Sequence, residues 1–295
     1  MIQIARKRLP EWLRRSVPVL SAEKTHNVLA QYRLNTVCES ALCPNRSECY
    51  SRKTATFMIL GNVCTRRCGF CAIDSGRPQP VEADEPERVA KAAQALGLEY
   101  VVVTSVARDE MPDEGARHFA DTICALKEEI PGVKVEVLTP DFHARRELIA
   151  RVVEAGPAVY NHNLETVARL QKKVRPQASY ERSLKVLETV KTLSAKITVK
   201  SGIMLGLGET GEEIFDAARD LHSAGCEILT LGQYLAPSSA HLPVEAFISP
   251  ADFQILQEEL MTLGFKEVFA GPYVRSSYHA GETFLNAKIL EHGAL

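Results

Sequence analysis

Short apolar runs alternate along the chain with longer stretches in which apolar residues recur every three or four positions. The apolar runs predict six strands, at residues 56–60, 100–104, 133–138, 158–161, 198–205 and 228–232. The stretches between them have the spacing of helices with one apolar face, as in Val89, Ala92, Ala93 and Leu96. A chain that alternates strands with amphipathic helices is expected to form repeated β-α units around a parallel sheet.

Turn-forming residues agree with this division. Gly97 closes the first helix, Pro131 and Gly132 precede the third strand, and Gly225 ends the helix before the sixth. The predicted fold class is therefore α/β, a partial (β/α)6 TIM-type barrel with N- and C-terminal extensions. The division expected is an N-terminal extension, a barrel and a C-terminal extension at residues 1–53, 54–234 and 235–295.

The chain has 295 residues, of which 45% are apolar and 24% charged, a composition typical of a folded soluble protein. No apolar run approaches the roughly 18 residues of a membrane span. A net charge of −2 gives no general attraction to nucleic acid or to an anionic membrane. The basic N-terminus is compatible with a transit peptide, but Pro10 and Trp12 favour a structured arm. We expect a cytoplasmic protein, and a monomer because no feature indicates an interface.

Six of the eight cysteines fall between residues 38 and 71. A chain of this length does not need disulfides for stability, so this clustering indicates a metal or cluster site. Cys124 and Cys226 stand alone in helix-like segments. We expect both to be buried structural thiols.

Cys64, Cys68 and Cys71 have C-x3-C-x2-C spacing directly after a predicted strand, at what would be the catalytic face of a barrel. Three thiolates can hold three corners of a cubane iron–sulfur cluster and leave the fourth iron open to a cofactor. The alternative is a zinc knuckle completed by a distant histidine. A closed zinc site, however, usually takes four ligands, often as two C-x2-C pairs.

Cys38, Cys43 and Cys49 form a second triad, C-x4-C-x5-C, in a segment with neither strand nor helix periodicity. None of these spacings pairs the thiols as a known zinc site does. Three more thiols within twelve residues suggest a second cluster held by a loop.

These motifs carry a resemblance to known enzymes. The strand followed by C-x3-C-x2-C, with Phe70 before the last cysteine, resembles the signature of radical S-adenosylmethionine (SAM) enzymes. The second triad, with Pro44 and Asn45 after Cys43, is similar to that of the lipoyl synthase family. Further blocks that resemble this family lie at 55–61, 103–106, 160–166, 200–210, 231–235 and 275–280. The resemblance covers about residues 9–281.

The resemblance implies two [4Fe-4S] clusters. The first triad would bind the cluster whose open iron chelates SAM. The second would be held by the other triad and a serine oxygen, which matches Ser276 in position, with Ser277 as the alternative. A serine oxygen is a hard, weak partner for a soft iron site, so this corner would be labile. Arg275 and His279 flank the serine and could tune the cluster through hydrogen bonds.

The resemblance also implies contacts to SAM. Thr104 and Ser105 correspond to positions that bind its methionine moiety, and Asn163 and Glu165 to ribose contacts. The full set of expected cofactor contacts is Phe70, Thr104, Ser105, Asn163, Glu165 and Met204. For Thr104, Ser105, Asn163 or Glu165 taken alone, the alternative is a polar barrel-rim residue without a ligand.

Three features have two interpretations. Residues 206–211 satisfy the dinucleotide pattern G-x-G-x-x-G, but they lie in the fifth unit. Residues 202–209 instead resemble the motif that lets backbone approach the adenine in radical enzymes. Lys200 and the Arg108–Asp109 pair could contact cofactor or substrate, or form surface ion pairs. Ala107 and residues 236–240 depart from the usual family pattern, and the second departure bears on carrier recognition.

The implied activity is insertion of two sulfur atoms at carbons 6 and 8 of a protein-bound octanoyl-lysine. These C–H bonds are too strong for acid–base removal, so a radical from SAM would abstract hydrogen, with the second cluster consumed as sulfur donor. The implied partners are octanoylated lipoyl-carrier domains (2-oxoacid dehydrogenase E2 components or the glycine-cleavage H protein), an electron donor such as ferredoxin or flavodoxin, and an iron–sulfur carrier for rebuilding the cluster.

Three other functions compete with this one. A biotin-synthase-like sulfur inserter lacks the N-terminal triad, and an RNA methylthiotransferase would be expected to carry a basic RNA-binding module. A non-catalytic iron–sulfur carrier is a different class of protein. A carrier needs no barrel that binds adenine, so cleavage of SAM would exclude it.

Overall fold

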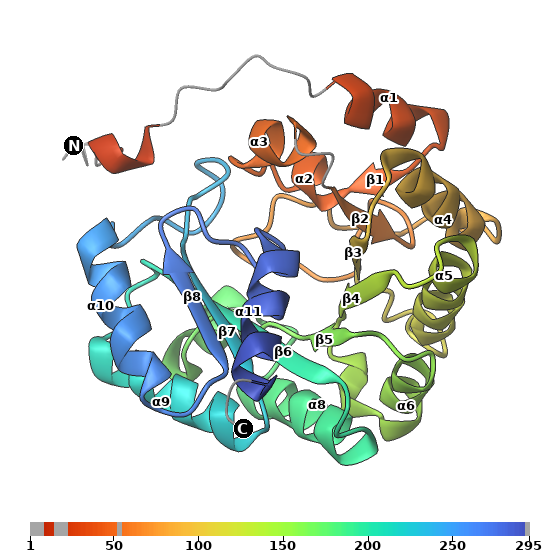
Figure 1. Ribbon diagram of the computed structural model, residues 1–295. Coiled ribbons are helices and arrows are strands. Elements are labelled where there is room, and N and C mark those ends of the chain that lie inside the picture. The colour runs from red at the N-terminus through yellow and green to blue at the C-terminus, as the bar shows by residue number, and fades with distance from the viewer. Residues whose placement is uncertain (1–8, 15–22, 52–54, 293–295) are drawn as a thin grey trace.

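The centre of the molecule is one eight-stranded sheet in the order β1 to β8 (Figure 1). The computed structural model describes residues 9–14, 23–51 and 55–292. The strands are β1 Asn35–Thr36, β2 Thr56–Ile59, β3 Tyr100–Ser105, β4 Lys134–Leu138, β5 Val159–Asn161, β6 Thr198–Leu205, β7 Ile228–Gln233 and β8 Glu267–Gly271. β1 is antiparallel to β2, and every later pair is parallel. The sheet is therefore an open, partial barrel.

This architecture confirms the predicted fold class. The six predicted strands correspond to β2–β7, and their ends differ from the prediction by no more than one residue. Two strands were not predicted. β1 has only two residues, and β8 extends the parallel sheet by one strand beyond the predicted barrel. Both lie in the expected extensions, so these segments contribute to the sheet itself.

Most of the longer helices surround the sheet on its outside, whereas the last one, near the C-terminus, lies in front of the strands in this view (Figure 1). The longer ones are α1 Glu23–Gln31, α4 Glu85–Leu96, α5 Ala116–Glu129, α6 Arg146–Glu154, α8 Tyr180–Leu193, α9 Gly211–Ser223, α10 Pro250–Met261 and α11 Ala280–His292. Short helical turns are η1 Glu11–Leu13, α2 Val37–Ser40, α3 Arg46–Ser51, η2 Phe142–Ala144, η3 Ala168–Leu170 and α7 Gln171–Val174. Among the described residues, no helix is both long enough and apolar enough to cross a membrane.

Local sequence signals set the helix ends. Thr210 and Glu213 form a reciprocal capping box at the start of α9, in which each side chain accepts from the backbone N–H of the other. At the end of α4, Gly97 adopts φ +69°, a left-handed conformation that few other residues adopt. These caps fix where α9 begins and where α4 ends.

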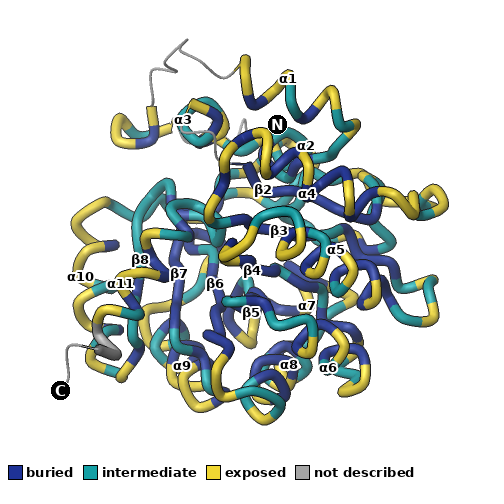
Figure 2. The backbone as a smooth tube through the Cα atoms, turned by 45° about the vertical axis from the view of Figure 1, so that its right-hand side comes forward, coloured by how far each residue is buried: buried dark blue, intermediate teal, exposed yellow. Residues whose placement is uncertain are grey.

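The core lies between the sheet and the covering helices, where Figure 2 shows the strands as a buried band. Residues of both strand faces are fully buried, including Phe57, Val101, Val137, Tyr160 and Leu229, each 0% exposed. Strands buried on both faces are expected where helices cover a parallel sheet. This rigid layer carries the loops at the carboxyl ends of the strands.

Lys200 lies inside this core and is only 1% exposed. Its Nζ lies 2.9 Å from Glu136 Oε1, and Tyr100 donates to the same carboxylate at 2.5 Å. The prediction that Lys200 either contacts cofactor or forms a surface ion pair is therefore wrong. The burial of Lys200 could not be predicted from the sequence, because a lysine within an apolar strand does not indicate which residue is its partner.

Replacing Lys200 with methionine should lower the free energy of unfolding by about 3–5 kcal/mol, because Glu136 would remain buried without a counter-charge. Lys185 pairs with Glu188 on the surface of α8, so its replacement should cost less than about 1 kcal/mol. Chemical denaturation followed by circular dichroism would compare Lys200→Met with Lys185→Met. Equal losses in the two variants would contradict the buried pair.

Candidate active site

One cavity of about 540 Å³ opens at the carboxyl ends of the strands. Its volume lies within the range of about 300–1,000 Å³ typical of sites for small molecules. Its lining includes all the expected cluster ligands and the full set of expected SAM contacts: Cys38, Cys43, Cys49, Cys64, Cys68, Cys71, Phe70, Thr104, Ser105, Asn163, Glu165, Met204 and Ser276. Ser277, the alternative to Ser276, lines the same cavity.

The first triad lies in the loop after β2. Cys64 Sγ accepts hydrogen bonds from two backbone N–H groups, of Arg66 at 3.4 Å and of Ala107 at 3.3 Å. Further along the loop, the carbonyl of Cys71 accepts from His241 Nε2 at 3.1 Å. N–H groups on a sulfur stabilise its thiolate form and tune a bound cluster. The loop is thus shaped by contacts from distant parts of the chain.

The thiols of this triad lie close enough to affect one another. Burial raises the pKa of Cys71 to about 12, and the neighbouring Cys68 and Cys64 thiols add to the rise. Burial also raises the pKa of Cys68, and the positive charge of Arg175 opposes the rise. All eight cysteines are free of disulfides. Three adjacent free thiols facing one cavity suit the soft iron of a cluster.

The second triad is carried by α2, α3 and the turn between them. Thr36 caps α2, where its hydroxyl accepts from the backbone N–H of Glu39. Cys38 is 7% exposed, and burial raises its pKa to about 11. The turn is tied to the C-terminal extension, because Asn45 Nδ2 donates to the carbonyl of Tyr273 at 2.7 Å. The structure thus brings the N-terminal triad beside the segment that contains Ser276.

A short polar chain links the two parts of the cavity. Ser276 Oγ donates to Asn163 Oδ1 at 2.9 Å, and Asn163 Nδ2 donates to Glu165 Oε1 at 3.1 Å. Burial raises the pKa of Glu165, while the charge of Arg175 and the amide of Asn163 oppose the rise. The expected ligand of the second cluster therefore touches an expected ribose contact.

Ser105 and Thr104 end β3 at the wall of the cavity. Thr104 Oγ1 donates to the carbonyl of Leu138 at 2.9 Å. By contrast, the buried Oγ of Ser105 has no hydrogen-bond partner among the residues that the structure describes. Buried polar atoms are rarely left unpaired, so Ser105 is suited to receive a polar group of a bound molecule. The donor set and this hydroxyl fit a cluster with SAM beside it.

Two arginines at the cavity were not predicted to contact the cofactor. Arg175 is 8% exposed, and its Nη1 donates to the carbonyl of Asn163 at 3.0 Å. Arg275, expected only to tune the second cluster, lines the cavity and is partly buried, and burial lowers its pKa against the opposing charges of Cys43 and Glu165. Arg275 therefore lies near the second triad and near an expected ribose contact. No spacing rule in the sequence connects either arginine to the cysteines.

Gly232 of β7 leaves room for the segment that contains Ser276. A Cβ at this position would lie 2.0 Å from the carbonyl oxygen of Val274, a contact that the backbone could only relieve by moving. At Gly211, by contrast, no atom lies within 4 Å of an added Cβ. The absence of a side chain at position 232 thus permits the close approach of residues 274–276.

Gly232→Ala should reduce the expected sulfur insertion by roughly tenfold or more, because a shift of about 1 Å in the segment that contains Ser276 is enough to lose that much rate. Gly211→Ala provides the matched control and should retain the wild-type rate. Both variants would be assayed for product and for iron content. Equal activity of the two would show that the 274–276 segment tolerates displacement.

Other sequence-based interpretations need correction. Cys124 is exposed, not buried, whereas Cys226 is buried as expected, at 2% exposure. Arg108 is buried and donates to the carbonyls of Leu60 and Gln79 and to the Glu110 carboxylate, so it is neither a surface ion pair nor part of the cavity lining. Asp109 contacts Arg66 rather than the cavity.

The glycine-rich turn does not offer a phosphate site. The carboxylate of Glu209 accepts from the backbone N–H groups of Gly206 and Leu207. A Cβ on Gly206 would lie 2.4 Å from the carbonyl oxygen of Ala246, so another segment already covers the turn. The dinucleotide interpretation of residues 206–211 therefore fails, because the N–H groups it requires are occupied.

Comparisons with known proteins agree with this geometry. The model of the radical SAM superfamily matches residues 58–221. The chain is 54% identical over 273 residues to a lipoyl synthase of Caldanaerobacter subterraneus, which covers 92% of this chain and 96% of that protein. It is 52% identical over 281 residues to a lipoyl synthase of Thermus thermophilus, which covers 94% and 87% respectively.

Solved structures with a similar fold share little sequence. A methylornithine synthase superposes with a TM-score of 0.54 at 15% identity and covers 92% of this chain and 77% of its own. The FeFe-hydrogenase maturase HydG from Carboxydothermus hydrogenoformans gives 0.55 at 16% identity, with 78% and 65% covered. These likenesses concern the fold alone. On the family match and the identity across nearly the whole chain, this protein belongs to the lipoyl synthase family of the radical SAM superfamily.

Proposed function

We propose that the protein inserts two sulfur atoms at carbons 6 and 8 of an octanoyl group linked to a carrier-protein lysine. The observation that supports this most directly is the single cavity lined by both cysteine triads and by Ser276. An enzyme that transfers sulfur to a radical must hold the radical source and the sulfur donor near one substrate. A protein that only stores clusters would not need the two triads to line one cavity.

Membership of the radical SAM superfamily implies a [4Fe-4S] cluster and SAM. When bound, this pair supplies the radical that removes hydrogen from an unactivated carbon. In our proposal Cys64, Cys68 and Cys71 ligate that cluster. Thr104 and Ser105 bind the methionine part of SAM, and Asn163 and Glu165 orient the ribose. Phe70 and Met204 are the remaining contacts.

We further propose that Cys38, Cys43, Cys49 and Ser276 hold a second [4Fe-4S] cluster, which donates sulfur. The contact between Ser276 and Asn163 supports this, because it puts the donor side of the cavity next to the SAM side. Two C–H bonds of the acyl chain are broken and two C–S bonds are formed. The hydrogens leave with the SAM-derived adenosyl groups, and the electrons come from a donor such as ferredoxin or flavodoxin.

The cavity also suits an aliphatic chain. Leu138, Ile203, Leu235 and Pro237 contribute apolar surface to its lining. An apolar wall excludes water and so protects a radical from side reactions. We propose octanoylated carrier domains as substrates, with the 236–240 segment near the carrier. An iron–sulfur carrier would rebuild the donor cluster, and residues 54–234 would form the catalytic unit, flanked by the extensions.

The proposal is tested anaerobically. Protein reconstituted with iron and sulfide would receive reductant, SAM and an octanoyl-lysine peptide, and 5′-deoxyadenosine and peptide mass would be followed. About two deoxyadenosines per dithiolated product, with loss of the second cluster, would support it. Deoxyadenosine without sulfur on the peptide would exclude the substrate but keep the radical chemistry. Neither product from fully loaded protein would favour an iron–sulfur carrier.

A further inference from the structure

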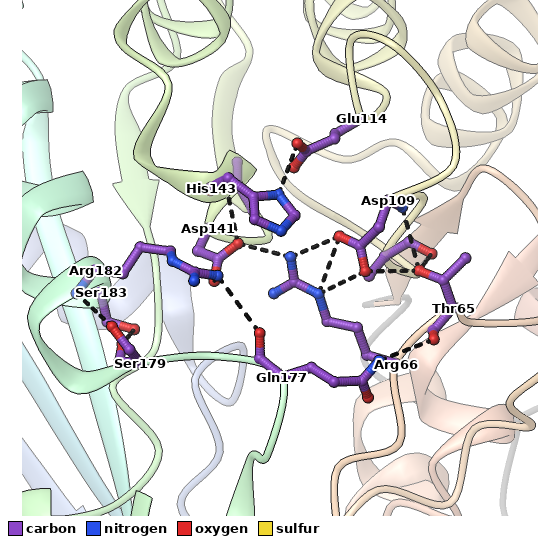
Figure 3. Close-up of polar contacts among 12 residues, drawn as sticks. Thr65, Arg66, Asp109, Glu114, Asp141, His143, Gln177, Ser179, Arg182 and Ser183 are labelled. Carbon is purple, nitrogen blue, oxygen red and sulfur yellow. Dashed lines mark hydrogen bonds and ion pairs between the residues drawn. The ribbon is translucent and has the colours of Figure 1, made fainter. Parts of the chain in front are cut away.

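Arg66 lies within the first cysteine loop, two positions after Cys64, and its guanidinium is buried. The side chain is only 6% exposed. Its Nε donates to Asp109 Oδ2 at 2.8 Å, and its Nη2 donates to Asp109 Oδ1 at 2.6 Å and to Asp141 Oδ1 at 2.7 Å (Figure 3). Asp109 follows β3 and Asp141 follows β4. One side chain of the loop therefore binds the ends of two neighbouring strands.

Both aspartates are held by further contacts. Asp141 is 0% exposed and also accepts from Arg182 Nη1 at 3.2 Å, while Asp109 accepts from Thr65 Oγ1 at 3.0 Å. Burial would raise the pKa of Asp141, but the hydrogen bonds and charge of Arg66 outweigh it and keep that pKa below its ordinary value. The network therefore holds charged, geometrically fixed partners on either side of Arg66.

The same loop positions the sulfur of Cys64. Two N–H groups point at Cys64 Sγ, and they belong to Arg66 itself and to Ala107, two residues before Asp109. The backbone N–H of Thr65 in turn donates to the carbonyl of Ala107 at 3.1 Å. Any tilt of Arg66 relative to Asp109 would therefore change both hydrogen bonds to the thiol.

The backbone beside Asp141 is strained. Phe142, His143 and Ala144 have φ values of 44°, 48° and 54°, which side chains with a Cβ rarely adopt. Such conformations cost of order 1–3 kcal/mol each and persist only where the surroundings impose them. Here Asp141 accepts from the N–H of His143, and His143 Nδ1 lies 2.8 Å from Glu114 Oε1. The anchor point of Arg66 is therefore maintained against local strain.

A metal ion is not needed to explain this cluster of charges. Asp109, Glu114 and His143 have ligand atoms within 4.8 Å of one another. However, Arg66 donates to Asp109, and Arg145 donates to Glu114 at 2.9 Å. The guanidinium groups already compensate both carboxylates, so the arrangement favours a rigid support over a cation site.

We propose that Arg66 is a positioning residue that fixes the cysteine loop to the ends of β3 and β4 and orients the two N–H groups on Cys64 Sγ. It thereby sets the reduction potential of the cluster and its geometry toward SAM, because hydrogen bonds to cluster sulfurs govern both. This inference rests on the proposed ligation of a cluster by Cys64, Cys68 and Cys71.

Arg66→Lys tests the inference, because lysine keeps the charge but cannot bridge two carboxylates with a planar fork. Arg67→Lys is the matched control, since Arg67 is the next residue and its side chain is exposed. In full-length, reconstituted protein we expect Arg66→Lys to retain wild-type iron and sulfide. Its turnover of SAM should fall by about tenfold or more, with an altered midpoint potential and electron paramagnetic resonance spectrum. Arg67→Lys should match the wild type in SAM turnover, midpoint potential and spectrum.

Asp109→Asn provides a second variant should Arg66→Lys fold poorly, and it should shift the potential in the same way. Wild-type turnover, SAM KM, potential and spectrum in folded Arg66→Lys would overturn the inference while leaving the proposed function intact. Loss of iron from folded Arg66→Lys would also overturn it, because Arg66 would then be required for the loop to bind a cluster at all. Failure of the wild-type protein to bind a cluster would overturn the proposed function instead, and the inference with it.

Discussion

Replacement of Cys64 with alanine should lower SAM cleavage by at least about a thousandfold, or about 4 kcal/mol in transition-state free energy. The reason is that Cys64, Cys68 and Cys71 supply the only three thiols near the end of β2 that face the cavity among the described residues. A cluster with a missing ligand would be lost or displaced. Deoxyadenosine formation, measured anaerobically with reconstituted protein, would report the loss.

Cys124→Ala is the matched control for this variant. It removes one thiol from the same protein, but Cys124 is exposed on α5, outside the cavity lining. SAM cleavage should remain at the wild-type rate. Substantial cleavage by Cys64→Ala, or its equal loss in both variants, would contradict the assignment of the first triad.

Replacement of Cys38 with alanine should separate SAM cleavage from sulfur insertion. The first triad would be unchanged, so SAM cleavage should persist, whereas thiolated peptide should fall by at least about a hundredfold, or about 2.7 kcal/mol. Cys38 is buried and lies on α2, a different segment of the chain from the loop after β2. Parallel measurement of deoxyadenosine and peptide mass would show the split. Loss of both products would mean that the two sites do not load independently.

Ser276 and Ser277 can be distinguished in the same assay. Ser276→Ala removes the hydroxyl that donates to Asn163. Ser277→Ala removes the same group from the next residue, which lines the same cavity. We expect Ser276→Ala alone to impair sulfur insertion. The reverse ranking would assign the ligand to Ser277.

The sequence was sufficient for most of the sheet because its central strands are apolar and most have a glycine or proline close to one end. It failed for β8, whose burial pattern includes only one fully buried residue, Val268. It also failed for β1, which is too short to show a pattern. Strands of this kind are defined by their partners rather than by their own residues.

The candidate site, too, could be predicted only in part. The cysteine spacing identified residues that the fold brings to one cavity, because the members of each triad are close in sequence and stay close in any fold. The partners of Arg66, by contrast, are 43 and 75 residues away. Cys124 was misjudged because it follows Ile123 on α5. One position along a helix turns a side chain by about 100°, away from the apolar face.

The meeting of the two ends of the chain has a consequence for biosynthesis. Tyr278 donates to Glu48 across 230 residues, next to the N-terminal cysteines and Ser276. A ribosome synthesises Cys38, Cys43 and Cys49 early and Ser276 late. On the proposed ligation by Ser276, the SAM-side site can be complete while the second triad still lacks its fourth ligand. Iron delivery to the nascent protein should accordingly be sequential, with the donor cluster stable only after the C-terminal segment is released and docked.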